Sequence, residues 1–156
     1  MNNLAKNIQK ILIFITISIL PNFAFAKNHE IQMLANYNGE AMVFNPSLIK
    51  INLGDVVTFI PTDFDHNSQS IFLPKGSKKW QGRDNEEIAI SFDQEGIYIY
   101  ECSNHHIMAM VGIIQVGESH NLDEAKKFAL NYKKTLVMNK DRLDKYFEKI
   151  TYHPYS

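Results

Sequence analysis

The stretch Tyr98–Val116, YIYECSNHHIMAMVGIIQV, places a cluster of sulfur and nitrogen donors between two apolar segments. It contains the only cysteine of the chain, Cys102, and within nine residues it adds the imidazole of His105 and the thioether of Met110. A thiolate, imidazoles and a weak thioether are the ligand set expected for a copper ion that alternates between two oxidation states. This stretch therefore predicts a metal loop between two β-strands.

The fourth donor must come from another part of the chain, and His66 is the candidate. The segment Asp55–Pro61 reads as a strand and would deliver the turn Asp65–Asn67 to one end of a β-structure. Asn67 is placed to hold the two ligand loops together or to donate a hydrogen bond towards the cysteine sulfur. Two imidazoles and a thiolate in a near-trigonal plane, with a weak axial thioether, suit both Cu(I) and Cu(II).

The N-terminal segment reads as a leader and not as part of the core. Two lysines form a short basic start, Ile11–Leu20 is apolar, and Ala24–Ala26 supplies the small residues that a signal peptidase accepts. The apolar run of about ten residues is too short for a membrane span of roughly 20. We therefore expect residues 1–26 to be a cleaved signal peptide, and the mature chain to start at Lys27, in the periplasm and without a membrane anchor.

Composition narrows the class of protein. The chain has 156 residues, 45% of them hydrophobic, which fits one domain with one core and argues against disorder. Its formal net charge of −1 falls to −3 without the leader's two lysines, and this balance does not indicate a nucleic-acid partner. A single cysteine cannot form an internal disulfide, which leaves a buried thiol, an intermolecular bridge or a metal ligand.

Short strands separated by turn residues occupy the chain from His29 to Val116, at a spacing typical of a β-sandwich or barrel. We expect strands over residues 29–35, 41–44, 48–53, 56–60, 68–73, 87–92 and 97–102, and a last one ending at Val116. After Gly117 the apolar period becomes helical, over residues 122–132 and 140–150. The segment Asn121–Glu124 resembles a capping box for the first helix.

The strand before the metal loop predicts where these helices pack. Its side chains alternate, with Tyr98, Tyr100 and Cys102 on one side and Ile97, Ile99 and Glu101 on the other. If the cysteine points into the sandwich, the two isoleucines point outward and need a cover, because exported monomers rarely expose such a stripe. We expect the amphipathic C-terminal helices to cover it.

Together these residues resemble the cupredoxins, the type 1 blue copper proteins, and among them the pseudoazurins. The resemblance rests on Gly54–Asn67, on Tyr98–Val116 with its Cys-x2-His-x4-Met spacing, and on the two helices after the sandwich. It implies an all-β fold, a Greek-key β-sandwich with two C-terminal α-helices packed on one outer face. It divides the mature chain into a copper-binding domain, residues 27–118, and a helical extension of the same domain, residues 119–156.

The resemblance also implies a function, that of a single-electron carrier that is not an enzyme. One copper ion would be bound by His66, Cys102, His105 and Met110. The ring of His105 would emerge through an apolar patch that serves as the electron port, with Met42, Ile107, Met108 and Ala109 around it. A redox protein such as a copper nitrite reductase or a c-type cytochrome would dock there transiently, on a monomer.

Several residues depart from the pattern that the resemblance implies. Pseudoazurins usually have proline where Asn104 stands. Lysines ring the patch of the family, whereas here Glu101 precedes Cys102 and Phe64 stands where a lysine is common. A histidine common in the first strand is replaced by Gln32, and three lysines keep some positive charge near the patch: Lys75, Lys78 and Lys79. We expect these differences to affect the hydrogen bonding at the sulfur and the choice of partner, and we expect His106 to lie at the surface.

Two other functions fit some of the same residues. Cys102 could be a nucleophile with His66 or His105 as its base, but such an enzyme has no use for Met110. Cysteine and histidine also suit zinc, so a copper- or zinc-binding storage or delivery module without electron transfer remains open. An intense blue thiolate-to-copper band after addition of Cu(II) would distinguish the electron carrier from both.

Overall fold

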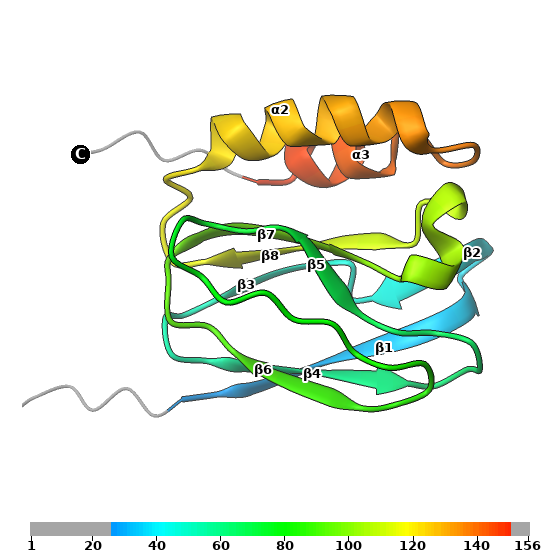
Figure 1. The fold of residues 1–156 in the computed structure, drawn as a ribbon, viewed down its shortest axis with the longest axis horizontal. Helices are drawn as coiled ribbons and strands as arrows, with labels where there is room; N and C mark the ends of the chain where they lie inside the picture. The colour runs from blue at the N-terminus through cyan, green and yellow to red at the C-terminus, as the bar shows by residue number, and fades with distance from the viewer. Residues whose placement is uncertain (1–25, 151–156) are drawn as a thin grey trace, which may run out of the picture.

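The computed structural model describes residues 26–150 (Figure 1). Residues 1–25 of the expected leader and residues 151–156 lie outside the described part. The strands are β1 (Asn28–Tyr37), β2 (Glu40–Asn45), β3 (Leu48–Ile51), β4 (Val56–Pro61), β5 (Gln69–Phe72), β6 (Ile88–Ser91), β7 (Gly96–Glu101) and β8 (Val111–Val116). The helices are α2 (Leu122–Tyr132) and α3 (Arg142–Glu148), with short 3-10 turns η1 (Ser103–Met108) and η2 (Lys133–Thr135). The expected strands and helices are confirmed.

Two four-stranded sheets pack face to face, and the helices add a third layer. One sheet has the order β2-β1-β4-β6 and the other β3-β8-β7-β5. Both sheets are mixed, because β1 runs parallel to β4 and β3 runs parallel to β8, whereas the other neighbours are antiparallel. Figure 1 shows α2 and α3 lying over the outer face of the sheet that contains β7 and β8. This confirms the expected β-sandwich with two helices on one outer face.

The core between the sheets is rich in aromatic rings. Tyr100 on β7 meets Phe44 and Phe59 edge to face, with ring centroids 4.7 and 5.0 Å apart. The residue opposite Tyr100 on β8 is Gly112. A Cβ at position 112 would run into the ring of Tyr100, so the glycine leaves room for this ring.

A second core lies between the sheet and the helices. Ile97 and Ile99 are fully buried there, in one cluster with residues of both helices, among them Ala125, Tyr132 and Leu143. Because β7 and β8 are covered on both faces, every residue of these two strands is buried. The prediction that the helices cover the outer isoleucines is confirmed. Within residues 26–150, none of the helices has the length and apolar character needed to span a membrane.

The capping box predicted at Asn121 is wrong. This side chain makes no cap hydrogen bond to α2. Instead, its Oδ1 accepts from the backbone N–H of Ile97 at 2.7 Å and its Nδ2 donates to the Ile97 carbonyl at 3.0 Å. The pairing of β5 with β7 ends at Ile99, so the backbone of Ile97 lies beyond it and the asparagine amide takes the place of a neighbouring strand. Asn121 therefore ties α2 to the sheet.

Candidate metal centre

The metal loop joins β7 to β8 and is closed at its base by backbone hydrogen bonds. The N–H of Cys102 donates to the carbonyl of Met110 at 2.9 Å, which sets the two sulfur residues side by side. Between them η1 turns the chain, and the N–H of His105 donates to the Cys102 carbonyl at 3.2 Å. Ala109 ends this turn in the left-handed conformation, with φ 58° and ψ 44°. This turn brings His105 back over Cys102.

The donor atoms of three predicted ligands, His66, Cys102 and His105, lie close together. The Sγ of Cys102 lies 3.9 Å from Nδ1 of His66 and 3.5 Å from Nδ1 of His105. The three ligand atoms lie within 4.8 Å of one another. Typical metal–sulfur and metal–nitrogen distances, at angles between tetrahedral and trigonal, place such donor atoms about 3.5–3.8 Å apart. The observed separations therefore fit one metal ion bound by all three side chains.

The fourth predicted ligand, Met110, lies in the same interior region. Its side chain is fully buried and belongs to the core cluster that also contains Cys102. Its backbone N–H donates to the His105 carbonyl at 3.3 Å, so one turn of chain links these two residues. A thioether at this place suits a weak, soft ligand to copper.

Burial controls the charge of the donors. It raises the pKa of the Cys102 thiol, although backbone N–H groups of Asn67, Asn104 and His105 favour the thiolate. Burial also lowers the pKa of His66, and the neighbouring His105 lowers it further. The His66 ring therefore stays neutral and keeps a lone pair for a metal. A cation bound here would supply the charge that keeps the buried thiol deprotonated.

Asn67 connects the His66 turn to the start of the metal loop. Its Oδ1 accepts from the N–H of Ser103 at 2.9 Å, and its Nδ2 donates to Oγ of Ser103 at 2.8 Å and to Asp84 at 2.6 Å. Its own backbone N–H points to the sulfur of Cys102 at 3.5 Å. This geometry orients the cysteine relative to the histidine next to Asn67 in sequence.

His106 lies partly at the surface, with 32% of its side chain exposed, and its ring is also bonded to Glu101. Nδ1 of His106 lies 2.7 Å from Oε2 of Glu101, which also accepts from the hydroxyl of Tyr132 at 2.6 Å. Gln69 donates to the other carboxylate oxygen at 2.8 Å. Glu101 is only 6% exposed, and these three side chains surround its carboxylate. The alternation of β7 did place Glu101 on the helix side, but nothing in the sequence indicated its partners.

An exposed apolar surface surrounds the loop. Ile107 is 55% exposed and Phe64, beside the His66 turn, is 89% exposed. Met42 and Met108 are half-buried, whereas Ala109 is completely buried and contributes no surface to the expected patch. Sequence reasoning also missed Val137 and Met138, both exposed. Their backbone N–H groups donate to the Ile107 carbonyl at 2.9 and 3.0 Å, which places them beside the loop.

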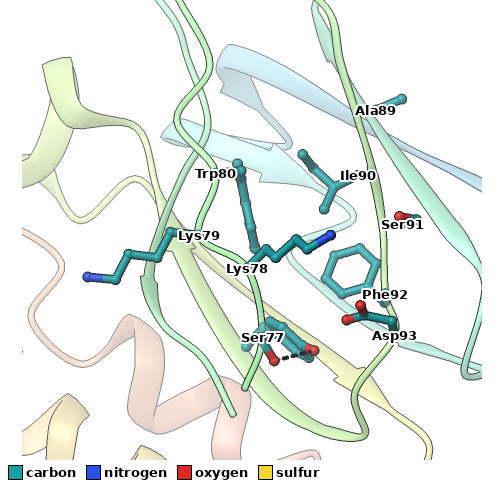
Figure 2. A pocket seen from close by; sticks show the side chains of 10 residues that line it. Ser77, Lys78, Lys79, Trp80, Ala89, Ile90, Ser91, Phe92 and Asp93 are labelled. Atoms are coloured by element: carbon teal, nitrogen blue, oxygen red, sulfur yellow. Dashed lines mark hydrogen bonds between the residues drawn. The ribbon is translucent and has the colours of Figure 1, made fainter. Parts of the chain in front are cut away.

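A separate pocket of about 250 Å³ lies beside the loop that follows β5 (Figure 2). Trp80, Phe92 and Tyr98 form its aromatic wall, and it shares no lining residue with the three clustered ligands. In Figure 2, Lys78 extends across the pocket whereas Lys79 points away from it. These lysines thus lie at this pocket and do not line the cluster of donors.

Comparison with known proteins identifies the class. A family model described as copper binding proteins, plastocyanin/azurin family, matches residues 31–117. The chain therefore belongs to this family of copper-binding proteins, the cupredoxins. The expected cofactor is thereby confirmed, because the family binds copper and the chain presents a His-Cys-His group for one copper ion.

Within this family the chain is similar to pseudoazurins. It is 40% identical to pseudoazurin of Paracoccus pantotrophus over 105 residues, which cover 65% of this chain and 72% of the relative. It is 34% identical to pseudoazurin of Methylorubrum extorquens over 130 residues, 81% and 84% of the two chains. The crystal structure of native pseudoazurin from Hyphomicrobium denitrificans matches with a TM-score of 0.73 and 34% identity, covering 80% of this chain and 99% of that one. The chain is thus a cupredoxin close to pseudoazurin.

Proposed function

We propose that this protein carries single electrons between redox proteins of the periplasm on one type 1 copper ion bound by His66, Cys102, His105 and Met110. The observation that carries the proposal is the placement of the Cys102 sulfur between two imidazole Nδ1 atoms, at 3.9 and 3.5 Å. Copper bound at these donors supplies the one-electron change between Cu(I) and Cu(II).

The protein's own part is to hold the donors in the same positions in both oxidation states. The bond between the backbones of Cys102 and Met110 fixes the two sulfur ligands at the base of the loop. The contacts of Asn67 fix the His66 loop against the Cys102 end. Because little has to rearrange on electron gain or loss, the activation barrier to transfer stays low.

We place the path of the electron at His105. Among the three clustered residues, His66 and Cys102 are buried and only His105 is partly exposed. Ile107, Met108 and Met42 are the proposed surface around this ring. A small apolar surface of this kind suits the brief contacts of redox proteins, whose interfaces are at the low end of the size range.

The proposed partners are redox proteins such as a copper nitrite reductase or a c-type cytochrome. Phe64 extends the apolar surface with a side chain that carries no charge. Glu101 presents little charge to a partner, because it is buried and accepts three hydrogen bonds. We therefore expect docking to depend more on apolar contact than on charge, and to change little between low and moderate salt. The protein would dock as a monomer.

The burial of Cys102 argues against the enzymatic alternative. Its side chain has no exposed surface, so a substrate has no access to the sulfur as a nucleophile. We propose that the chain has no catalytic activity of its own. Alkylation of the folded protein by iodoacetamide should therefore be slow, and rapid alkylation of Cys102 would contradict this proposal.

The decisive experiment is addition of Cu(II) to the purified mature protein. The proposal requires an intense blue thiolate-to-copper band with one copper per chain, and a reversible one-electron couple. A colourless protein that binds zinc instead would favour the storage or delivery alternative. Met110→Gln should retain copper and shift the reduction potential, because the axial ligand tunes it. A storage protein would show no reversible couple in either form.

We also infer that residues 1–26 are a signal peptide and that the mature chain acts in the periplasm. The support is the order of basic, apolar and small residues in this segment. N-terminal sequencing of the protein recovered from the periplasmic fraction should start at Lys27. Recovery from the cytoplasm with the first 26 residues intact would contradict this inference.

A further inference from the structure

Arg142, the first residue of α3, extends its side chain into the protein and not into solvent. The residue is 5% exposed. Its Nη1 donates to the carbonyls of Ala109 at 2.7 Å and Met42 at 2.8 Å, and its Nη2 donates to the carbonyl of Ala41 at 3.1 Å. One guanidinium thus joins the C-terminal helix, the strand β2 and the metal loop, segments that lie 33 to 101 residues apart.

The three carbonyls belong to peptide planes that determine the positions of two methionines. The Ala109 carbonyl shares its rigid peptide plane with the N–H of Met110, so fixing this oxygen fixes the backbone that carries the thioether. The carbonyls of Ala41 and Met42 belong to the two peptide planes on either side of Met42. Arg142 therefore acts on the backbone of both residues.

Two of these residues need such support. Ala109 has a φ of 58° and Met42 a φ of 51°, the left-handed region that residues with a Cβ seldom occupy. Strained backbone of this kind persists only where the surroundings determine it strongly. Hydrogen bonds from a charged, planar donor to both carbonyls are a strong restraint, since guanidinium bonds are stronger than neutral ones and fixed in direction.

The surroundings of the charge also indicate a specific role. The only carboxylate with a recorded contact to Arg142 in the described residues is that of Glu40, 3.7 Å away and itself largely exposed. Burying a cation that bonds mainly to carbonyls costs free energy that an apolar side chain would avoid. The gain from this arrangement is that distant backbone segments are held in place.

We propose that Arg142 is a positioning residue for the copper site: it fixes the Ala109–Met110 peptide and thereby the place of the axial thioether. The inference deepens the function proposed above and rests on it. It gives the C-terminal extension a part in tuning the metal, in addition to covering the sheet. Its hydrogen bonds to the metal loop and to β2 go to backbone carbonyls, so its action on the site runs through the backbone.

The test compares Arg142→Lys and Arg142→Met with the matched control Arg83→Met, whose arginine is exposed and pairs with the exposed Glu86 at 3.5 Å. The first measurement uses metal-free protein and follows amide hydrogen exchange at Met110. Both Arg142 variants should exchange about tenfold faster or more, because a charge-assisted bond that holds this peptide is lost. The control should exchange at the parent rate. This measurement tests Arg142 even if copper binding fails.

The second measurement uses the copper-loaded proteins and records the visible spectrum and the reduction potential. Lysine keeps the positive charge but not the planar fork of donors, so a positioning role predicts that Arg142→Lys changes the spectrum and the potential as Arg142→Met does. A purely electrostatic role predicts that Arg142→Lys matches the parent. Parent-like exchange and spectrum in both variants would overturn the proposal.

Thermal unfolding distinguishes a local role from a global one. Should Arg142→Met fail to fold, Arg142→Lys carries the test, since it retains the charge and the aliphatic stem. Failure of Arg142→Lys to fold would also overturn the proposal, because it would make Arg142 a support of the whole fold and not of the Met110 end. If no variant or parent binds copper but Met110 exchange still accelerates, the proposed function fails and the positioning role stands.

Discussion

The two ends of the metal loop are held by different parts of the chain. The Cys102 end is held by the neighbouring ligand loop, through the bonds of Asn67 to Ser103 and of Asn104 Nδ2 to the carbonyl of Asp65 at 3.2 Å. These partners lie beside the ligands in sequence. The Cys102 end is therefore a local unit in which each ligand loop orients the other.

The Met110 end is held by the C-terminal extension. Asn139 donates to the Met108 carbonyl at 3.1 Å, Val137 donates to the Ile107 carbonyl, and Arg142 donates to the carbonyl of Ala109. These contacts come from the chain between and at the start of the helices, about 30 residues after the loop. The comparison shows that a motif with ligand spacing determines one end of its own site, whereas the other end depends on a separate element.

The largest expected effect comes from removing the element that holds the Met110 end. A chain that stops after Gly117 would expose Ile97, Ile99 and other residues of the second core. Each large apolar side chain contributes about 1.5–3 kcal/mol when buried. Their sum approaches the whole 5–15 kcal/mol stability of a typical domain. We expect no cooperative unfolding transition by circular dichroism.

The control for this truncation is a chain that ends at Ile150, which retains both helices and the described second core. It should unfold at the temperature of the full mature chain. If the chain ending at Gly117 unfolded cooperatively at that same temperature, the helices would be dispensable, and the Met110 end would need no support from them.

Substitution of Asn67 should weaken the Cys102 end. Asn67→Ala leaves the N–H of Ser103 without its acceptor and removes the bond to Asp84, in a buried place. Loss of one partner of a buried polar group costs about 1–3 kcal/mol. Urea unfolding should show this loss. Asn131→Ala is the control, because Asn131 is exposed, and equal losses in both variants would contradict the structural role of Asn67.

The asymmetry between the two ends also explains what the sequence could predict. Cysteine, histidine and methionine at ligand spacing, and Asn67 beside His66, are local patterns that carry their own chemistry, and the structure brings His66, Cys102 and His105 together. The alternation of β7 predicted the helix layer, because two outward isoleucines need a cover. In these cases, residues close together in the sequence are enough to explain the structure that forms.

Contacts between distant residues gave no such signal. Arg142 reads in the sequence as one more charged residue of an amphipathic helix, and only the packing of α3 reveals that it reaches Ala109. Asn121 matched a capping pattern, but its side-chain amide binds the backbone N–H and carbonyl of Ile97 instead of the helix N-terminus. The hydrogen bond between His106 and Glu101 likewise depends on how the loop packs beside β7, and local sequence does not reveal it. Side chains with several possible partners cannot be assigned from local spacing.

Substitution of Asn139 should weaken the Met110 end by the loss of a single hydrogen bond. Asn139 adopts a φ of 49° and donates to the Met108 carbonyl, so Asn139→Ala loses the bond and strains the backbone. Asn139→Gly loses only the bond, because glycine adopts this conformation freely. We expect a loss of about 0.5–1.5 kcal/mol for glycine and more for alanine, measured by urea unfolding. Equal losses would show that the conformation at residue 139 carries no cost.

The smallest expected effect concerns the sulfur itself. The backbone N–H of Asn104 faces Sγ of Cys102 and favours the thiolate. Asn104→Pro removes this donor, and Asn104→Ala keeps it but loses the side-chain bonds to Asp65. An N–H bond stabilises the electron-rich sulfur of the reduced site more than that of the oxidised site, so proline should lower the reduction potential.

Potentiometric titration of the two copper-loaded variants measures this difference. Alanine should stay near the parent potential, and proline should fall below it with the blue band retained. If alanine fell as far as proline, the side-chain link to the Asp65 carbonyl would control the potential and not the N–H group. The Cys102 end would then tune the metal as we propose for the Met110 end, through the position of its backbone and not through a bond to the sulfur.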